Sequence, residues 1–284
     1  MSETLLDRDS LWPKMPIVRV AANAAGRDWV VGDLHGACDL LEKALGMVDF
    51  NTSRDRLFCL GDMIDRGAKS MEVLRLSREP WFYAQRGNHE QACLDLHGEY
   101  TVENKRMHPD ALNFGGRILG EAWLRKLSDS EQLEVISILV EAPVLFTVES
   151  KRGRVGLVHA EVPAQCTWAA LEKAVLHMPE NLQVCSAALC SRRMPERLAS
   201  GDSHMMAELP PRVEGVARVY HGHVALRWPF RHENRYYIDT GAWQAGTADS
   251  WSALTLVQLD VDSRTFDRRV TRKIKDGIRV IADD

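Results

Sequence analysis

The chain has 284 residues, and its 36 basic and 40 acidic side chains give a net charge of −4 and a pI near 6.2. Hydrophobic residues make up 45% of the sequence and charged residues 27%, a balance that excludes a disordered or collagen-like chain. The slight acidity argues against general attraction to nucleic acid or to a membrane surface, so we expect neither as a partner.

The N-terminal half predicts strands that alternate with helices. Residues 1–26 show no strong pattern, and we expect them to be a lead-in to a single domain that spans residues 27–284. Short apolar runs predict strands at 29–31, 56–60 and 81–84. Apolar spacing predicts helices at 39–47 and 70–76, with Ser70 as the N-cap of the second. This alternation indicates βαβ units with parallel strand pairs.

The C-terminal half mixes helices and strands. We expect a helix at 129–141 that stops before Pro143, and then a hairpin formed by 144–148 and 155–158. Further strands are expected at 216–220, 236–238 and 254–261. Residues 161–215 contain short helical pieces and are expected to be an insertion that contributes to a substrate cleft. The predicted fold class is α/β, with two packed mixed β-sheets flanked by helices.

Polar clusters follow several of the predicted strands. They are Gly-Asp-Leu-His-Gly at 32–36, Gly-Asp-Met-Ile-Asp-Arg-Gly at 61–67, Arg-Gly-Asn-His-Glu at 86–90, His159, and Gly222-His223. Ligands bind at the carboxyl ends of strands in α/β sheets, and the glycines allow a ligand to approach the backbone closely. Carboxylates, imidazoles and an amide oxygen together suit a hard or borderline divalent metal. Without thiolates in these clusters, a structural zinc site is not expected.

The sequence contains no strong signal for membrane insertion, secretion or disulfide bonding. No run approaches the ~20 apolar residues that span a bilayer, and the first residues lack the apolar core of a secretory signal. The six cysteines form no Cys-x-x-Cys pair, so we expect reduced thiols and a cytoplasmic location.

The ordered motifs resemble those of the calcineurin-like metallophosphoesterases. Within that family the chain resembles the phosphoprotein phosphatase type, especially the bacterial and bacteriophage lambda serine/threonine protein phosphatases. The matching motifs lie between about residues 29 and 245, which is most of the chain. The resemblance implies the family's β-sandwich with βαβ units and two divalent metal ions. We expect Mn²⁺ because the bacterial members of the family use it, although the ligand types also suit Fe, Zn or Co.

The resemblance also implies a set of metal ligands. The first metal would be held by Asp33, His35 and Asp62. The second would be held by Asp62, Asn88, His159 and His223, so that Asp62 bridges the two. Two such metals share a hydroxide and clamp a phosphate.

Further residues receive roles from the same resemblance. His89 would protonate the leaving alkoxide, and Asp65 would orient and polarise the His89 ring. The alternative for His89 is a packed histidine at the start of a helix. Phosphate oxygens would be bound by Arg66, Arg86 and Arg192. A guanidinium matches phosphate geometry, although surface salt bridges are the alternative for Arg66 and Arg86. Arg192 is preferred over Arg193 because it fits a phosphate arginine of the lambda-like enzymes.

Three segments depart from the family pattern or leave their roles open. His221-Gly222-His223-Val224 stands where the family has Gly-His-Thr, which leaves His221 as an extra histidine that is packed or supports a ligand. Glu161, in His-Ala-Glu-Val-Pro, either reaches the site or has a structural role at a helix entry or in a loop. Asn113-Phe114-Gly115-Gly116 shapes a cleft wall or is a simple turn.

The leading functional hypothesis is a binuclear-metal phosphomonoesterase that hydrolyses phosphoserine and phosphothreonine by direct attack of a metal-bridging hydroxide. Phosphotyrosine is a further candidate, and the expected partner is a phosphorylated protein or a small phosphomonoester. One alternative is a dinucleoside tetraphosphate or other nucleotide phosphohydrolase. The symmetrical enzymes of that kind usually carry alanine at the position of Asp65, so Asp65 favours the phosphatase. Another alternative is a non-catalytic metal-binding scaffold for phosphoproteins.

Overall fold

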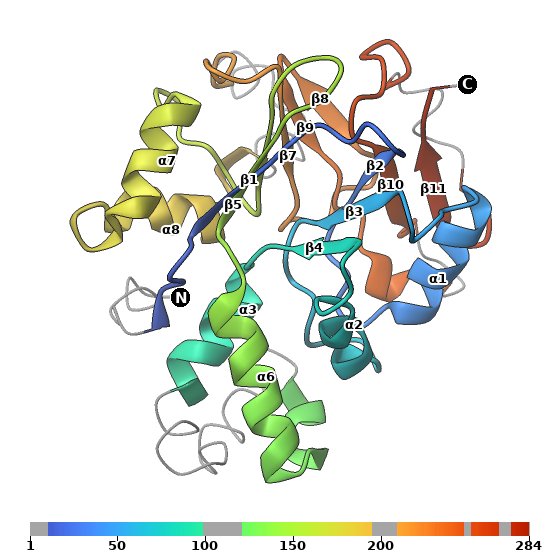
Figure 1. Ribbon diagram of the computed structural model, residues 1–284, viewed down its shortest axis with the longest axis vertical. Coiled ribbons are helices and arrows are strands. Elements are labelled where there is room, and N and C mark those ends of the chain that lie inside the picture. The colour runs from blue at the N-terminus through green and yellow to red at the C-terminus, as the bar shows by residue number, and fades with distance from the viewer. Residues whose placement is uncertain (1–10, 99–120, 195–208, 247–250, 267–273, 284) are drawn as a thin grey trace.

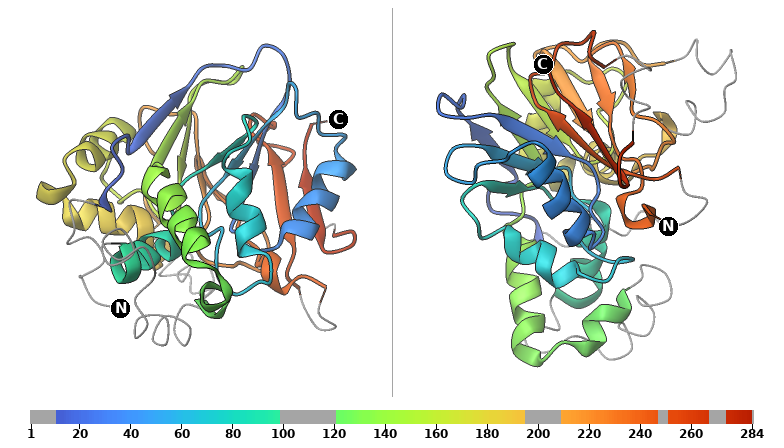
Figure 2. Two further views of the ribbon diagram at one scale, coloured as in Figure 1. Left: turned by 60° about the horizontal axis from the view of Figure 1, so that its bottom comes forward. Right: turned by 90° about the vertical axis from the view of Figure 1, so that its right-hand side faces the viewer.

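The computed structural model describes residues 11–98, 121–194, 209–246, 251–266 and 274–283. Two mixed β-sheets form the centre of the molecule, and helices cover their outer faces (Figure 1). This confirms the predicted α/β class. Figure 2 shows α7 and α8 on one side of the sheets and α1 on the opposite side.

The first sheet has five strands in the order β11-β10-β2-β3-β4. Their bounds are β2 Asp28–Val31, β3 Arg56–Cys59, β4 Phe82–Ala84, β10 Leu254–Gln258 and β11 Ile278–Ile281. Strands β2, β3 and β4 run parallel, so their carboxyl ends lie at one edge of the sheet. Strand β10 is antiparallel to β2, and β11 pairs with β10 at the edge.

The second sheet has six strands in the order β1-β5-β6-β7-β9-β8. Their bounds are β1 Ile17–Val20, β5 Leu145–Val148, β6 Val155–Val158, β7 Arg218–His221, β8 Phe230–His232 and β9 Arg235–Tyr237. Strands β5 and β6 form the predicted antiparallel hairpin, and β7 runs parallel to β6. The carboxyl ends of β6 and β7 therefore also lie side by side.

The described ranges contain α-helices and several shorter helical turns. The α-helices are α1 Cys38–Met47, α2 Ser70–Leu76, α3 Asn88–Cys93, α6 Asp129–Glu141, α7 Trp168–Leu176 and α8 Leu182–Cys190. A π-helical turn, η3 Leu94–Gly98, follows α3. The 3₁₀ turns are η4 Glu121–Lys126, η5 Met178–Glu180 and η6 Ala242–Gln244. None of the helices in the described ranges is long and apolar enough to cross a bilayer.

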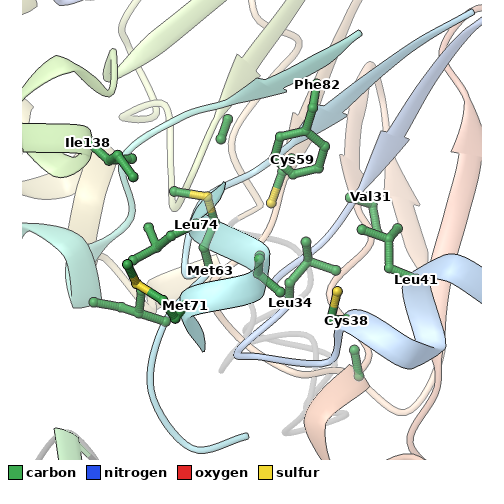
Figure 3. Packing of buried hydrophobic residues seen from close by; sticks show 14 of the residues in the cluster. Val31, Leu34, Cys38, Leu41, Cys59, Met63, Met71, Leu74, Phe82 and Ile138 are labelled. Carbon is green, nitrogen blue, oxygen red and sulfur yellow. The ribbon is translucent and has the colours of Figure 1, made fainter. Parts of the chain in front are cut away.

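Alternating side chains divide the core into layers. In β3, Phe58 points between the two sheets, while Leu57 and Cys59 pack on the outer face of the five-stranded sheet. Figure 3 shows the outer layer, in which Val31 and Cys59 meet residues of α1 and α2. Helices α7 and α8 cover the other sheet in a third layer. Because the central strands of both sheets are fully buried, among them β2, β6 and β7, their ends are held in fixed relative positions.

Two sequence-based expectations need correction. Residues 1–26 are not wholly a lead-in, because Ile17–Val20 forms β1 and pairs in parallel with β5. Ser70 is not an N-cap, because α2 begins at Ser70 and the preceding Lys69 occupies the cap position. The Ser70 hydroxyl instead accepts a hydrogen bond from the backbone N–H of Asp65, at 3.0 Å. Most predicted helices and strands otherwise match the observed bounds to within a few residues.

Candidate active site

The carboxyl ends of β2, β3, β4, β6 and β7 bring the polar clusters together. The loop after β2 hydrogen-bonds to the loop after β3, since the N–H groups of Leu34 and His35 donate to the carbonyl of Asp62. The N–H of Gly222, after β7, donates to the carbonyl of His159, after β6. Residues almost 200 positions apart in the sequence therefore form one site, as the strand ends predicted.

Three histidines are oriented by backbone carbonyls. The Nδ1 atom of His35 lies 2.7 Å from the carbonyl of Ile64, and Nδ1 of His159 lies 2.7 Å from the carbonyl of Leu60. A carbonyl accepts only, so both rings carry their proton on Nδ1 and leave Nε2 as a bare lone pair. The Nε2 atom of His35 is buried and has no hydrogen-bond partner among the described residues. This is how metal-binding histidines are held.

His223 has the opposite orientation. Its Nε2 lies 3.1 Å from the carbonyl of Cys190, at the end of α8, so Nδ1 is left with the lone pair. That Nδ1 atom is also buried, with no partner in the described part of the chain. Burial, His159 and the charge of Arg192 lower the pKa of His223 to about 3, so the ring is neutral at physiological pH. Burial likewise lowers the pKa of His35 to about 3.

Asp62 lies between two groups of potential ligand atoms. One group contains His35, Asp62 and His89, and the other contains Asp62, His159 and His223. Within each group the ligand atoms lie within 4.8 Å of one another. The Oδ2 atom of Asp62 is 3.5 Å from Nε2 of His35, and Oδ1 is 3.4 Å from Nε2 of His159. A carboxylate in this position can bridge two cations.

Asn88 and Asp33 add oxygen atoms to the site. The Oδ1 atom of Asn88 lies 3.0 Å from Nε2 of His159. Both carboxylate oxygens of Asp33 accept from the N–H of His223, at 2.9 and 3.1 Å. Burial and the charges of Asp239 and Asp62 raise the pKa of Asp33 well above its usual value. Three buried carboxylates in one place are costly unless cations neutralise them, so the donor set fits divalent metals.

His89 appears in the first group where the sequence predicted Asp33. Its Nδ1 atom, however, lies 2.6 Å from Oδ2 of Asp65, and its Nε2 lies 3.1 Å from Nη2 of Arg66. Burial lowers the pKa of His89, but the charges of Asp62 and Asp65 outweigh this effect and raise the pKa overall. With Nδ1 bonded to Asp65 and Nε2 accepting from Arg66, neither ring nitrogen is left bare, which suits an acid–base role better than a metal ligand.

The backbone at the site adopts unusual conformations. Left-handed φ values between 43° and 72° occur at His35, Asp62, Asp65, Arg66 and His223. Such values are uncommon for residues with side chains and often mark functional sites. Gly87 and Gly222 permit close approach: a Cβ on Gly87 would lie 2.2 Å from Oδ1 of Asp62, and one on Gly222 would lie 2.3 Å from Oδ1 of Asp33. Both glycines are therefore required for the carboxylates to lie where they do.

Glu90 holds two of the loops together, a role that the sequence reasoning missed. Its buried carboxylate accepts from the N–H groups of Asp62 and Met63, at 2.8 and 2.7 Å, and from that of Gly87, at 2.8 Å. The loop after β3 is thereby fixed to the start of α3. The only sequence signal for this role is an acidic residue three positions after Gly87, in the first turn of α3.

Arg66 and Arg192 lie near the ligand groups. Arg66 is exposed, and its guanidinium carbon lies 5.5 Å from the ring centroid of Trp243 in η6. Arg192 is exposed just after α8, close enough to His223 for its charge to lower the pKa of that ring. Both guanidinium groups are thus exposed cations beside the ligand groups. The exposed indole of Trp243 was not singled out from the sequence.

Arg86 differs from the prediction. Its guanidinium is fully buried beneath α3 and donates to the carbonyls of Leu11, Leu139 and Val140, at 2.8, 2.8 and 3.1 Å. It also donates to the side chain of Gln91, at 2.8 Å. These contacts join the N-terminal segment, α3 and α6. Arg86 therefore stabilises the fold, and its predicted phosphate-binding role is wrong because both terminal nitrogens, Nη1 and Nη2, donate to buried protein oxygens.

The structure also shows the contacts of Glu161 and His221, whose roles the sequence left open. Glu161 is buried and accepts from the hydroxyl of Ser191 and from the N–H of Met194, so it anchors the segment that carries Arg192. His221 lies outside both ligand groups: its Nδ1 is 2.7 Å from the carbonyl of Ala160 and its ring stacks on Tyr237. The Asn113–Gly116 segment, predicted to shape the cleft, lies outside the described residues.

Comparison with known proteins gives one consistent family. Residues 27–225 match the calcineurin-like phosphoesterase family. Serine/threonine-protein phosphatase 1 of Salmonella typhimurium is 32% identical over 227 residues, which cover 79% of this chain and 90% of that protein. The symmetrical bis(5'-nucleosyl)-tetraphosphatase of Shewanella loihica is 31% identical over 210 residues, which cover 72% and 68%. A crystal structure of a putative diadenosine tetraphosphatase superimposes with a TM-score of 0.56 at 20% identity, covering 85% of this chain and 92% of that one.

Proposed function

Because the chain belongs to the calcineurin-like phosphoesterase family, we propose that it is a binuclear-metal phosphomonoesterase that removes phosphate from serine and threonine side chains of proteins. The family makes it a hydrolase of phosphate esters. The finer assignment, to phosphoserine and phosphothreonine, depends on the groups around the proposed reaction centre.

The observation that carries the proposal is the position of Asp62, whose Oδ2 lies 3.5 Å from Nε2 of His35 and whose Oδ1 lies 3.4 Å from Nε2 of His159. We propose that Asp33, His35 and Asp62 hold one metal, and that Asp62, Asn88, His159 and His223 hold the other. The orientation of each histidine supports this assignment, because a backbone carbonyl takes the ring proton and leaves the other nitrogen free. We expect Mn²⁺, although Fe, Zn and Co accept the same ligand types.

When bound, the two metals supply positive charge for the phosphoryl oxygens and a water of lowered pKa. The residues around them bind and orient the substrate. The guanidinium of Arg66 is exposed beside His89 and would bind phosphoryl oxygens, with Arg192 approaching from the side of His223. Charge on the phosphate is thus balanced from two directions.

His89 would donate a proton to the oxygen that leaves. Its Nδ1–H is held by Asp65 at 2.6 Å, so the proton that it gives up would be carried on Nε2. Arg66 donates to this nitrogen at 3.1 Å and would release it as the guanidinium turns to the phosphate. Asp65 keeps the imidazole in one orientation and stabilises its positive charge. A serine or threonine alkoxide is a strong base and leaves poorly without a proton, so this pair is what a phosphoprotein substrate requires.

Of the segment 161–215, the structure describes 161–194 and 209–215, and we propose that these parts line the substrate cleft. Support for this comes from the carbonyl of Cys190, which orients His223, and from Glu161, which anchors the start of the Arg192 segment. We place the phosphorylated chain of the substrate along this side.

A nucleotide phosphohydrolase is the competing function, and the Shewanella loihica relative gives it weight. A nucleotide leaving group carries its negative charge on a phosphate, which is a weak base and needs no proton. The complete His89–Asp65 pair therefore favours a phosphomonoesterase. It also argues against a non-catalytic scaffold, which has no use for a proton donor.

The first test is hydrolysis of p-nitrophenyl phosphate by the purified protein, stripped with a chelator and then supplied with Mn²⁺. Turnover that requires Mn²⁺ in the wild type and is lost in Asp62→Asn supports the proposed centre. Turnover that persists in the chelated protein would contradict it. Absence of turnover with every divalent metal, together with cleavage of diadenosine tetraphosphate, would favour the nucleotide function.

The second test compares substrates on the Mn²⁺-loaded enzyme. We expect kcat/KM for a phosphoserine peptide to exceed that for diadenosine tetraphosphate. His89→Asn provides the matched control, because loss of the acid should slow the peptide reaction far more than the nucleotide reaction. The reverse preference in the wild type would overturn the proposed substrate class.

A further inference from the structure

The carboxylate of Asp65 is held from both sides. Its Oδ2 accepts from Nδ1–H of His89 at 2.6 Å, and its Oδ1 accepts from Nε1–H of Trp123 at 2.9 Å. Asp65 is completely buried, so water has no access to either oxygen. Trp123 belongs to η4, and its ring packs partly buried against the outer core layer. The indole is thus a fixed donor on the far side of the carboxylate from the proposed acid.

This second hydrogen bond restricts how the carboxylate lies. A carboxylate rotates broadly about its last torsion unless its partners fix it. With Trp123 on one oxygen, the other oxygen points at His89, and the imidazole is held in turn. Loss of the indole N–H would leave Oδ1 buried and unsatisfied, which favours rotation of the carboxylate away from His89.

We propose that Trp123 is a positioning residue for proton donation: its indole N–H fixes Asp65, which fixes His89 toward the leaving oxygen. The inference rests on the proposed phosphomonoesterase function and narrows it to esters with poor leaving groups. Trp123 does not touch the substrate. It acts through Asp65 and His89 only.

The leaving group provides a direct readout. Departure of a serine alkoxide, or of the phenoxide of phenyl phosphate, needs a proton, whereas 2,4-dinitrophenoxide leaves without one because its nitro groups spread the charge. A fault in the positioning of His89 therefore slows the first two esters and spares the third. A general loss of structure or of metal would slow all three.

Two variants separate the N–H donor from the bulk of the ring. Trp123→Phe keeps a large aromatic ring and removes the donor. Trp123→His keeps an N–H at the same position along the side chain, since its Nε2 is bonded as Nε1 is in tryptophan, and removes the six-membered ring. If the donor matters, the histidine variant retains the rate that the phenylalanine variant loses. If only packing matters, the order is reversed.

We would measure kcat and KM of the Mn²⁺-loaded full chain with a phosphoserine peptide, phenyl phosphate and 2,4-dinitrophenyl phosphate. For Trp123→Phe we expect kcat to fall about tenfold on the first two esters, the effect of one buried donor, with KM little changed. The rate on the dinitrophenyl ester should stay close to that of the wild type. Trp123→His should recover most of the loss.

Trp12→Phe is the matched control. Trp12 is also partly buried and also donates one indole hydrogen bond, to the carbonyl of Val175 at 3.1 Å, but it lies against α7, away from the acid. It should show no dependence on the leaving group. The double variant Trp123→Phe/His89→Asn should be no slower than His89→Asn, because the indole acts only through that ring.

Three outcomes would overturn the inference: an equal loss on all three esters, no loss on any, or a further tenfold loss in the double variant. If Trp123→Phe fails to fold, the test uses Trp123→His and the double variant Trp123→His/His89→Asn. Their rates on the three esters are compared in the same way. The proposed function is judged separately, by the wild-type rates alone. If the wild type cleaves none of these esters, that function fails and the role of Trp123 falls with it.

Discussion

The side chains of Asn88 and His159 meet acceptor to acceptor. The Oδ1 atom of Asn88 lies 3.0 Å from Nε2 of His159, whose proton is on Nδ1 and bonded to the carbonyl of Leu60. Two lone pairs at this distance repel each other, and Asp62 adds a third acceptor 3.4 Å from the same nitrogen. A cation held between these atoms, as we propose, would turn the repulsion into coordination. Binding of the proposed metal would therefore stabilise this arrangement.

Metal binding should therefore raise thermal stability. At a free Mn²⁺ concentration about a hundred times the dissociation constant, the free energy of unfolding should rise by roughly 2.7 kcal/mol for each site. Melting curves in chelator and in Mn²⁺ measure this shift. In Asn88→Ala the chelated protein should melt at the same temperature as the wild type or higher, because a repulsion is removed, while the shift with Mn²⁺ becomes smaller. An unchanged shift in the variant would exclude Asn88 as a ligand.

His89→Asn should lower kcat on a phosphoserine peptide by about 10²- to 10⁴-fold, the usual contribution of a general acid. Its metal content should stay the same, because the proposed ligand sets do not include His89. Metal analysis of the purified variant beside its steady-state kinetics tests both points. Loss of one metal per chain would instead make His89 a ligand, as its place in the first group of ligand atoms allows.

Trp243 should tune substrate binding through Arg66. The guanidinium of Arg66 lies 5.5 Å from the ring centroid, a cation–π contact worth about 0.5–1 kcal/mol at an exposed site. Trp243→Leu should thus raise KM by roughly two- to fivefold with kcat little changed. The same substitution in an Arg66→Ala background should have no further effect on KM. An equal rise in both backgrounds would mean that the indole contacts the substrate directly.

Much of the site could be predicted because strand order and motif order agree. Asp33, Asp62 and Asn88 follow three parallel strands, and parallel strands end at a common edge. The polar residues needed only short loops with glycines to meet there. His159 and His223 follow β6 and β7, which are also parallel neighbours. Local patterns were sufficient wherever the site is built directly on strand ends.

Residues that act across the fold could not be predicted in this way. Trp123 donates to Asp65 from 58 positions along the chain, and no local pattern distinguishes it from a core tryptophan. Arg86 stands directly before a ligand motif, which suggested the site, yet its side chain points the other way into the core. The direction of a side chain at a strand end depends on packing, and the sequence pattern does not contain it.

Arg86 and Arg66 should therefore respond in opposite ways to the same substitution. Burial lowers the pKa of the Arg86 guanidinium to about 9, and four hydrogen bonds hold it to Leu11, Gln91, Leu139 and Val140. Arg86→Met leaves buried carbonyls without donors and should reduce the free energy of unfolding by roughly 2–5 kcal/mol. The kcat/KM of the fraction that remains folded should stay close to that of the wild type.

Arg66→Met is the comparison for Arg86→Met. Arg66 is exposed, so its loss should change the free energy of unfolding by less than about 0.5 kcal/mol. Its kcat/KM for phosphomonoesters should fall at least tenfold, since a charge-assisted contact to phosphate contributes about 1.5–3 kcal/mol. Urea unfolding and steady-state kinetics on both variants separate the two roles. A stable Arg86→Met protein that binds phosphate weakly would restore Arg86 to the site.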